Sequence, residues 1–328
     1  MELRLNSKPA SSDTPALPET ILSVSGRFIR KAVIKDEEWL ADDTYGCPTD
    51  IVLALKDAAV RIDIFSFSQK LPDIKPKYPF PYEWDNVAAI DTAHFDQWWS
   101  RIPQEARKNY RRAIRRGVVV REFKLNDDLL RGIVSIYNET PMRQGRRFTH
   151  YGKDFATVKR EASTFSERCV FIGAFYDTEL IGFIKLIRSG SIGSIMHVVS
   201  KNRHYDKRPS NALITKAAEY CRDNGISFLV YGRYTYGNKI NNPLTEFKRR
   251  LGFEKVLVPV YYVALSNLGR IFHRSKLHRG LIGILPPVVI KVLLRLRSVV
   301  LQGVCLIPKN RNFSSEGLVN QMQKGADQ

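Results

Sequence analysis

The sequence predicts an α/β (α+β) fold built around a mixed, largely antiparallel sheet. Of the 328 residues, 44% are hydrophobic, and they are spread along the chain as in a globular protein. Three apolar runs joined by short polar turns lie between residues 169 and 199, which is the pattern of an antiparallel meander. Segments with helical spacing of apolar residues stand before and after this meander.

The chain divides by composition into four segments. We expect a polar, proline- and serine-rich disordered tail over residues 1–18, a smaller N-terminal α/β subdomain over 19–105, the main domain over 106–265, and a basic, amphipathic helical extension with its tail over 266–328.

The N-terminal subdomain contains short apolar runs at residues 50–55, 60–66 and 87–90. The last run indicates a strand, and the first two indicate two strands or a strand and a turn. Residues 71–82 contain several prolines and are expected to form an extended connection. No pattern in this subdomain points to a chemical role.

The main domain is expected to begin with helices around one strand. Residues 106–116 contain strong helix formers and end before Gly117, and the β-branched run 118–120 follows as a strand. Apolar residues recur at helical spacing over 130–137, after Asn126, Asp127 and Asp128 as an acidic, capping start. They recur again over 155–165, with Asp154 as the cap.

The meander and a second group of elements follow. Its strands are expected at residues 169–176, 180–187 and 192–199. Behind a basic loop, Ser210 is a good cap for a helix that closes at Asn224-Gly225. The last elements are expected to be a strand at 226–231, a short helix at 243–251 and a strand at 253–265.

Three segments carry a resemblance to known proteins: AFYDTELIGFIKL (174–186), LVYGRYTYGN…LTEFKRRLGFEKV (229–256) and KNYRRAIRRGVVV (108–120). The order of elements and the first segment resemble the GNAT acyltransferases. The other two segments resemble the Fem-type aminoacyl transferases of peptidoglycan bridge synthesis and the GNAT-like proteins near them. The resemblance implies a fold that passes an acyl group from a carrier to an amine.

The resemblance also implies where the acyl donor lies. The third meander strand is expected to part from the strand at 226–231 near Ser200, and the donor's thioester arm to pair with the main chain of Val198, Val199 and Ser200. Ordinary GNAT enzymes cradle the donor's pyrophosphate with a glycine-rich turn.

In this chain the matching place has no glycine and Pro209 lacks an amide donor. A helix start at Ser210 still offers free N–H groups to a phosphate. The candidate donor-binding residues here are Lys207, Arg208, Ser210 and Asn211, and the alternative is a solvated basic loop.

Candidate catalytic residues come from two elements and one loop. His197 lies in the third meander strand, where an imidazole can take the proton of the amine, or is simply a packed strand histidine. Lys248 occupies the place of the tyrosine acid of many GNAT enzymes, and the resemblance implies that it faces the reacting centre. The alternative is a solvated lysine. Tyr234 is an alternative proton donor or a packing residue.

The acceptor side is expected at the connection between the first two helices of the fold. Arg143, Arg146 and Arg147 surround a glycine there and are suited to grip an anion, and Glu139 is available as a base or as an anchor for the amine. Solvent-facing loops of this composition are also common.

The net charge indicates which classes of partner the protein attracts. Lysine and arginine number 52 against 33 acidic residues, a net charge of +19, which attracts nucleic acid, an anionic membrane leaflet or phosphate-bearing substrates. The basic helix at 106–116 can bind such a polyanion or be a solvated face. Residues 288–302 form an amphipathic stripe that either lies on an anionic membrane or covers the protein's own core.

Targeting and metal signals are not found in the sequence. The N-terminus has no signal-peptide pattern, so we expect a cytoplasmic protein. The membrane alternative for the 288–302 stripe leaves open a peripheral location at the inner face of the membrane. The four cysteines lack metal-ligand spacing, and no metal is expected.

The leading functional hypothesis is an N-acyltransferase that moves an acyl group from acetyl-CoA or another acyl-CoA to an amine. The amine belongs to a sugar-, lipid- or peptide-linked acceptor, which is either anionic or neutral, and the reaction serves cell-envelope synthesis. The first alternative is an aminoacyl-tRNA-dependent transferase of the Fem type, with tRNA the less favoured partner. The second is a non-catalytic GNAT scaffold that binds RNA or membrane through its basic face.

Overall fold

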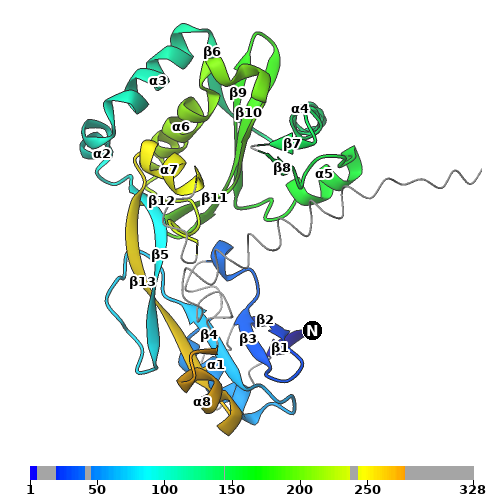
Figure 1. Ribbon diagram of the computed structural model, residues 1–328, viewed down its shortest axis with the longest axis vertical. Helices are drawn as coiled ribbons and strands as arrows, with labels where there is room; N and C mark the ends of the chain where they lie inside the picture. Colours follow the sequence, from blue (N-terminus) through cyan, green and yellow to red (C-terminus); the bar gives the residue numbers. More distant parts are fainter. Residues whose placement is uncertain (6–19, 41–45, 144, 237–242, 278–328) are drawn as a thin grey trace, which may run out of the picture. The chain divides into compact units, whose positions relative to one another are not determined.

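The computed structural model describes residues 1–5, 20–40, 46–143, 145–236 and 243–277, all within one compact unit (Figure 1). The amphipathic stripe predicted at 288–302 and most of the predicted extension lie outside these residues. Within the described part, no helix is both long enough and apolar enough to cross a membrane.

A single sheet of eleven strands organises the described residues. Its order is β1-β2-β3-β4-β13-β5-β12-β11-β10-β9-β6. The β3–β4 and β11–β12 pairs are parallel and the other pairs antiparallel, so the predicted mixed, largely antiparallel sheet is confirmed. The strands are β1 (Glu2–Leu5), β2 (Thr20–Ser25), β3 (Lys31–Ile34), β4 (Ile64–Ser68), β5 (Tyr82–Asp91), β6 (Val118–Phe123), β9 (Cys169–Tyr176), β10 (Glu179–Ser189), β11 (Ile192–Ser200), β12 (Phe228–Val230) and β13 (Glu254–Ala264).

The N-terminal region differs from its prediction in two places. Residues 2–5 were expected in a disordered tail, but they form β1, which pairs with β2. Residues 50–55 were expected in a strand or a turn, but they lie in the helix α1 (Pro48–Asp57). Its buried Ile51, Val52 and Leu55 follow helical spacing, and Pro48 is suited to the first helical turn.

The N-terminal strands extend the same sheet as the main domain. β5 lies between β12 and β13, so strands from both sides of residue 105 are neighbours. The division of the chain near that residue therefore stays a prediction. Between β3 and α1, the short 3-10 helix η1 (Glu37–Trp39) precedes residues that the structure does not describe.

Two groups of helices cover the two faces of the meander. α6 (Pro209–Asp223) packs on β9 and β10, and α2 (Phe95–Arg101) and α3 (Gln104–Arg115) pack against α6. α4 (Asp127–Tyr137) and α5 (Phe155–Ala162) cover the opposite face. The side chains of β10 alternate between the two cores: Ile184 and Leu186 face α6, whereas Phe183 faces α4.

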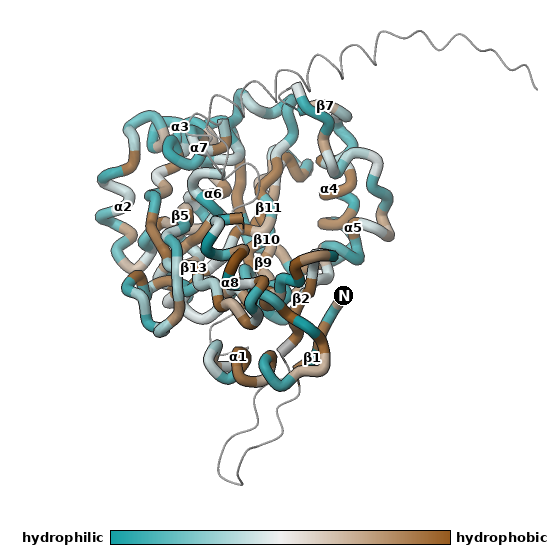
Figure 2. The backbone as a smooth tube through the Cα atoms, turned by 60° about the horizontal axis from the view of Figure 1, so that its bottom comes forward, coloured by the Kyte–Doolittle hydropathy of each residue, from teal (hydrophilic) through white to brown (hydrophobic). Residues whose placement is uncertain are grey.

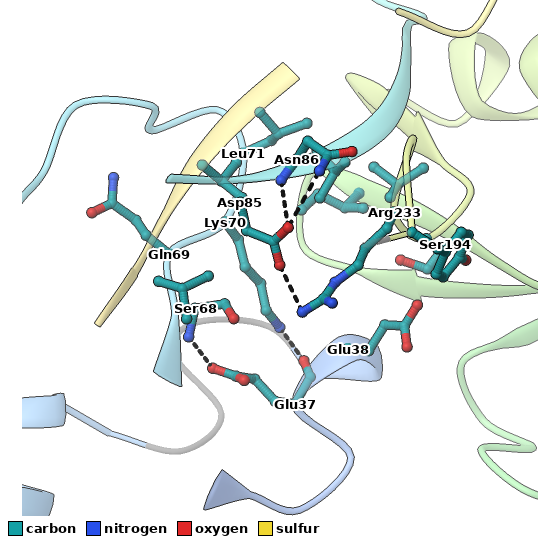
Figure 3. Close-up of a pocket in the computed structure, with 17 residues that line it drawn as sticks. Glu37, Glu38, Ser68, Gln69, Lys70, Leu71, Asp85, Asn86, Ser194 and Arg233 are labelled. Carbon is teal, nitrogen blue, oxygen red and sulfur yellow. Dashed lines mark hydrogen bonds and ion pairs between the residues drawn. The ribbon is translucent and has the colours of Figure 1, made fainter. Parts of the chain in front are cut away.

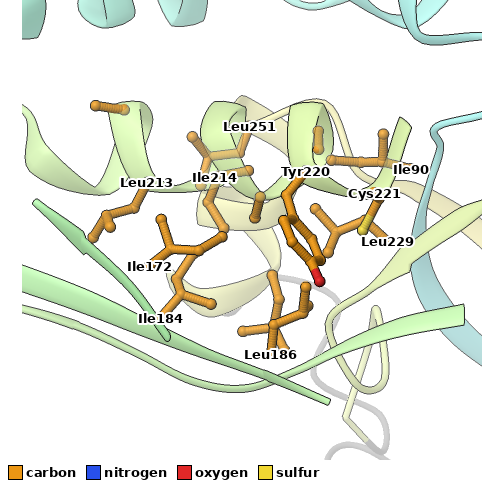
Figure 4. Close-up of a cluster of buried hydrophobic side chains, with 14 of the residues drawn as sticks. Ile90, Ile172, Ile184, Leu186, Leu213, Ile214, Tyr220, Cys221, Leu229 and Leu251 are labelled. Atoms are coloured by element: carbon orange, nitrogen blue, oxygen red, sulfur yellow. The ribbon is translucent and has the colours of Figure 1, made fainter. Parts of the chain in front are cut away.

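Figure 4 shows how the α6 core is filled, with Leu213, Ile214 and Tyr220 of α6 over aliphatic side chains of the sheet. The tube in Figure 2 is hydrophobic along β10 and β11 and hydrophilic along α3. The caps predicted for α4 and α5 are confirmed, because the side chains of Asn126 and Asp154 accept hydrogen bonds from Leu129 N and Thr157 N.

The remaining elements surround the ends of the sheet. They are the two-stranded hairpin β7 (Met142–Arg143) and β8 (Arg146–Arg147), the 3-10 helix η3 (Asn202–Lys207), α7 (Pro243–Arg250) and α8 (Asn267–Arg274). The helix predicted at 243–251 is therefore present as α7.

Candidate functional site

β11 and β12 part from each other at a β-bulge. They pair only from Ile192 to Ser194, opposite Phe228 to Val230. On the other side of β11 the register with β10 shifts between Lys185 and Leu186, and Met196 is the extra residue. A bulge bends its strand and ends regular pairing. Beyond it, β11 continues to Ser200 beside β10 alone among the described strands, so the predicted parting is present and begins at Ser194.

The chain after β12 follows β5 instead of β11. Tyr231 N donates to Ala88 O at 2.9 Å, and Ala88 N donates to Gly232 O at 2.8 Å. Within the described part of the chain, no strand therefore pairs with β11 from Ile195 to Ser200 on the side where β12 would continue.

A cavity of about 390 Å³ opens at the N-terminus of α6, and we call it the helix cavity. Its walls come from α3, α6 and α7, and its polar lining includes Arg208, Ser210, Asn211 and Arg250. Ser210 does not cap α6 as predicted: the helix begins at Pro209, and Arg208 is the N-cap residue with φ 54° and no side-chain cap bond. Proline is favoured in a first helical turn, which explains the earlier start.

The connection between β11 and α6 is held by a polar network where a glycine-rich turn would be expected. Lys201 is 4% exposed, and its Nζ donates to Ser135 Oγ at 2.7 Å and to Glu179. Partial burial would raise the pKa of Glu179, but hydrogen bonds from Lys201, His204 and Arg203 hold it at about 2. The Ser200 and Ser210 Oγ atoms are 3.1 Å apart and join β11 to the start of α6.

Glu139 and Arg143 belong to this network. Glu139 accepts hydrogen bonds from Asn202 N at 2.6 Å and from Arg203 N at 3.0 Å. Arg143 donates to Ser200 O at 2.7 Å and to Ile136 O at 3.0 Å. Both side chains therefore tie the end of α4 to the end of β11.

The other predicted donor and acceptor residues are less engaged in such contacts. Lys207 does not line the helix cavity, and its Nζ lies 4.4 Å from the centroid of the Tyr176 ring. Arg146 and Arg147 are exposed on β8. The side chain of Val198 packs on the core under α6, and that of Val199 packs on the core under α4.

His197 lies on the α4 face of the sheet in nearly filled surroundings. The cavity beside it, which Lys185, Tyr137 and Glu161 also line, measures about 10 Å³. Its ring makes an edge contact with His150 at 5.4 Å between centroids. Burial, helped by the nearby His150, lowers the pKa of His197 to about 4, so the ring is neutral at pH 7.

Lys248 is a fully buried lysine on α7. Its Nζ donates to Arg233 O at 2.6 Å and lies 4.5 Å from the centroid of the Tyr231 ring. Burial lowers the pKa of Lys248 to about 8, and the charge of Glu38 opposes part of that shift. Tyr234 accepts a hydrogen bond from Thr245 Oγ1 at its carbonyl and packs on the α6 core.

A second cavity, of about 470 Å³, lies around Arg233, and we call it the sheet cavity (Figure 3). Arg233 and Tyr236, which both contact Lys248, line it. Ser194 also lines it, whereas the next residue Ile195 faces the α6 core, so the two cavities lie on opposite faces of the sheet. The helix α7 contributes to both sites. The helix cavity is lined by Phe247, Arg250 and Leu251 at the end of α7, and Lys248 between them contacts the sheet-cavity residue Arg233.

The sheet cavity was not predicted from the sequence. Its polar residues include Glu37, Glu38, Lys70 and Asp85, all from the N-terminal segment in which no residue pattern indicated a chemical role. These residues are scattered in sequence and meet only because β5 joins the sheet between β12 and β13.

Comparison with known families agrees with this geometry. Residues 104–249 match a family model described as an acetyltransferase (GNAT) domain. That range includes α3, the meander, α6 and α7 up to Arg249, and therefore Lys248 and most of the lining of the helix cavity. No curated protein matches the chain.

Two solved structures share the fold over most of their length. FemX covers 84% of this chain and 90% of its own, with 11% identity and a TM-score of 0.52. L-PGS from Bacillus licheniformis covers 83% of this chain and 87% of its own, with 13% identity and a TM-score of 0.51. At these identities the likeness is one of fold alone.

Proposed function

We propose, from the premise that residues 104–249 form an acyltransferase domain of the GNAT type, that this protein is an N-acyltransferase. It moves an acyl group from an acyl-CoA such as acetyl-CoA to an amine on a sugar-, lipid- or peptide-linked acceptor. The observation that carries the proposal is the parting of β11 and β12 beside a buried lysine, with cavities on both faces of the sheet.

The donor is assigned to the helix cavity and the parted side of β11. Amide and carbonyl groups of residues 195–200 are suited to pair with the polar arm of an acyl-CoA. The phosphates would meet Arg208, Arg250 and the amide of Ser210, which is the first in α6 because Pro209 has none. Both arginines are exposed, and Arg250, which pairs with Glu246 at 2.7 Å, would exchange that carboxylate for the phosphate.

Lys248 is assigned to the developing negative charge. When the amine attacks, the carbonyl oxygen of the acyl group gains charge, and a donor in a water-poor site stabilises it strongly. The ammonium of Lys248 is fully buried and already donates to one carbonyl, that of Arg233. The almost filled surroundings of His197 do not support a role as base, so that role stays a prediction.

Aminoacyl-tRNA is the second candidate donor. It is supported by the fold likeness to FemX and by the basic residues of α3, which forms one wall of the helix cavity. Lys108, Arg111 and Arg115 are exposed there, where they can meet the phosphates of a polynucleotide. An ester-linked donor would use the same site beside Lys248.

Binding measurements distinguish the donors. Acetyl-CoA at 100 times its Kd should raise the unfolding free energy of the wild-type protein by about 2.7 kcal/mol, seen as a higher Tm. The double variant Arg208→Glu with Arg250→Glu should lose most of this shift. The matched reversal Lys56→Glu with Arg160→Glu, at exposed positions away from both cavities, should keep it.

The same assay with charged and uncharged tRNA tests the second candidate. Stabilisation by charged tRNA and none by acetyl-CoA would replace the first donor with the second. No stabilisation by either donor would contradict the proposed function.

A further inference from the structure

Glu38 extends into the sheet cavity from outside the transferase domain. It is the middle residue of η1, and Figure 3 shows its side chain beside Arg233. A methyl group on Gly232 would lie 3.6 Å from Glu38 Oε1, so the carboxylate approaches the chain where it leaves β12. The cavity therefore receives a carboxylate beside the segment that also binds Lys248.

η1 is held by one hydrogen bond to the Glu37 side chain and by two to its backbone carbonyls. Ser68 N donates to Glu37 Oε1 at 2.6 Å, and Lys70 Nζ donates to Glu37 O at 2.5 Å. Arg168 donates to Trp39 O at 3.1 Å. Glu37 thus serves to hold η1, and the position of Glu38 beside it is determined by the fold.

Glu38 differs from the other carboxylates of the cavity in its partners. Asp85 forms an ion pair with Arg233 at 2.7 Å, and Glu37 bonds to Ser68. Among the described residues, Glu38 makes no hydrogen bond, although the charges of Arg233, Lys248 and Lys70 act on it. Its loss of solvation outweighs these charges and raises its pKa. Glu38 is nevertheless exposed, so its carboxylate is open to a ligand that supplies N–H donors in place of water.

We propose that Glu38 binds the amino group of the acceptor in the sheet cavity and takes its proton, so that the N-terminal segment completes the transferase site. This rests on the proposed function. The amine nitrogen forms a bond to the acyl carbon, and the carbon–sulfur bond of the donor breaks. An acceptor bound as an ammonium loses two protons: the first passes to Glu38 before the attack and then to solvent, and the second leaves the nitrogen as the amide forms. The released thiolate takes up one proton, so one proton is released overall.

The test compares two amines that differ in their need for such a carboxylate. Hexylamine is an ammonium ion at pH 7, whereas aniline is already neutral. The Glu38→Gln variant keeps the size of the side chain and removes its charge. We expect kcat/KM for hexylamine to fall by about 100-fold or more, with the KM for acetyl-CoA unchanged. The kcat/KM for aniline should fall far less, because aniline needs no proton removed before it attacks.

Two further variants separate chemistry from folding. Glu38→Asp keeps the charge and should recover part of the rate with hexylamine. Glu167→Gln removes an exposed carboxylate elsewhere and should behave as wild type. Equal losses for both amines, or an unchanged rate in Glu38→Gln, would overturn the assignment of Glu38.

A calorimetric titration with hexylamine alone keeps the inference separate from the proposed function. If the wild-type protein transfers no acyl group, binding of hexylamine that is lost in Glu38→Gln preserves the amine site and rejects the transferase. If the wild-type protein transfers acyl groups but Glu38→Gln binds hexylamine equally well, the transferase stands and the Glu38 site is rejected. No binding to the wild-type protein rejects the site.

Discussion

At the residue scale, the buried lysine of α7 determines what the site can do. Lysine is almost never fully buried without a partner, because its charged form loses solvation there. Lys248 has a carbonyl and two aromatic rings as neighbours, and its pKa falls to about 8. At neutral pH it is therefore mostly charged but can lose its proton within the physiological range.

The charged form of Lys248 predicts a descending pH profile. If its ammonium stabilises the oxyanion, kcat should fall as pH rises through about 8, because the charged fraction is lost there. The Lys248→Met variant should lower kcat by about 100- to 1,000-fold, and its kcat should no longer fall as pH rises through about 8. Steady-state rates from pH 6 to 10 check this. A rate that rises through pH 8 in the wild type would assign Lys248 as a base instead.

His197 is predicted to affect stability more than catalysis. Its pKa of about 4 in the folded protein lies below the ordinary value of 6.5, so the unfolded chain binds more protons between these pH values. Folding stability should therefore fall as pH drops from 6.5 to 4. The His197→Gln variant should show a weaker fall in denaturant titrations over this range while keeping most of its activity. A large loss of activity in His197→Gln would restore the catalytic role.

At the element scale, side chains from distant elements hold the connection from β11 to α6 through hydrogen bonds. Glu139 at the end of α4 accepts hydrogen bonds from the first two amides of η3, and its side chain is 14% exposed. In ordinary GNAT domains, by the resemblance, a glycine-rich turn occupies this place. Here the network replaces backbone freedom with fixed contacts.

Removal of the Glu139 carboxylate tests that role. The Glu139→Ala variant leaves two amides at the start of η3 without their acceptor and should lower the free energy of unfolding by about 1–3 kcal/mol. Urea titrations measure this, with Glu167→Ala as the exposed control. A change below about 0.5 kcal/mol, the size typical of a surface substitution, would show that the network does not hold the connection.

The elements were predictable where local patterns determine them. The meander, the caps Asn126 and Asp154, and the stop of α7 before Gly252 follow from turn and cap residues near in sequence. The prediction failed for α1, because its closely spaced apolar residues also fit a buried strand. It failed for the Ser210 cap because Pro209 begins the helix one residue earlier.

At the scale of the whole molecule, the site depends on strand order, which no local pattern encodes. Lys248 was named through a family resemblance, but its burial follows from the packing of α7 against the end of β12. The role of Glu38 could not be predicted from the sequence around it. Glu38 reaches the sheet cavity only because β4, β5 and β13 join the sheet of the transferase domain. The active centre proposed here therefore includes residues on both sides of residue 104.

The central claim is that the acyl donor lies along the parted side of β11 with its phosphates at the start of α6. Hydrogen–deuterium exchange with and without saturating acetyl-CoA tests it most directly. We predict slower exchange in residues 195–200 and in the first turn of α6, and no change in β1–β3. Protection confined to other regions, with residues 195–200 unaffected by a donor that binds, would contradict the account.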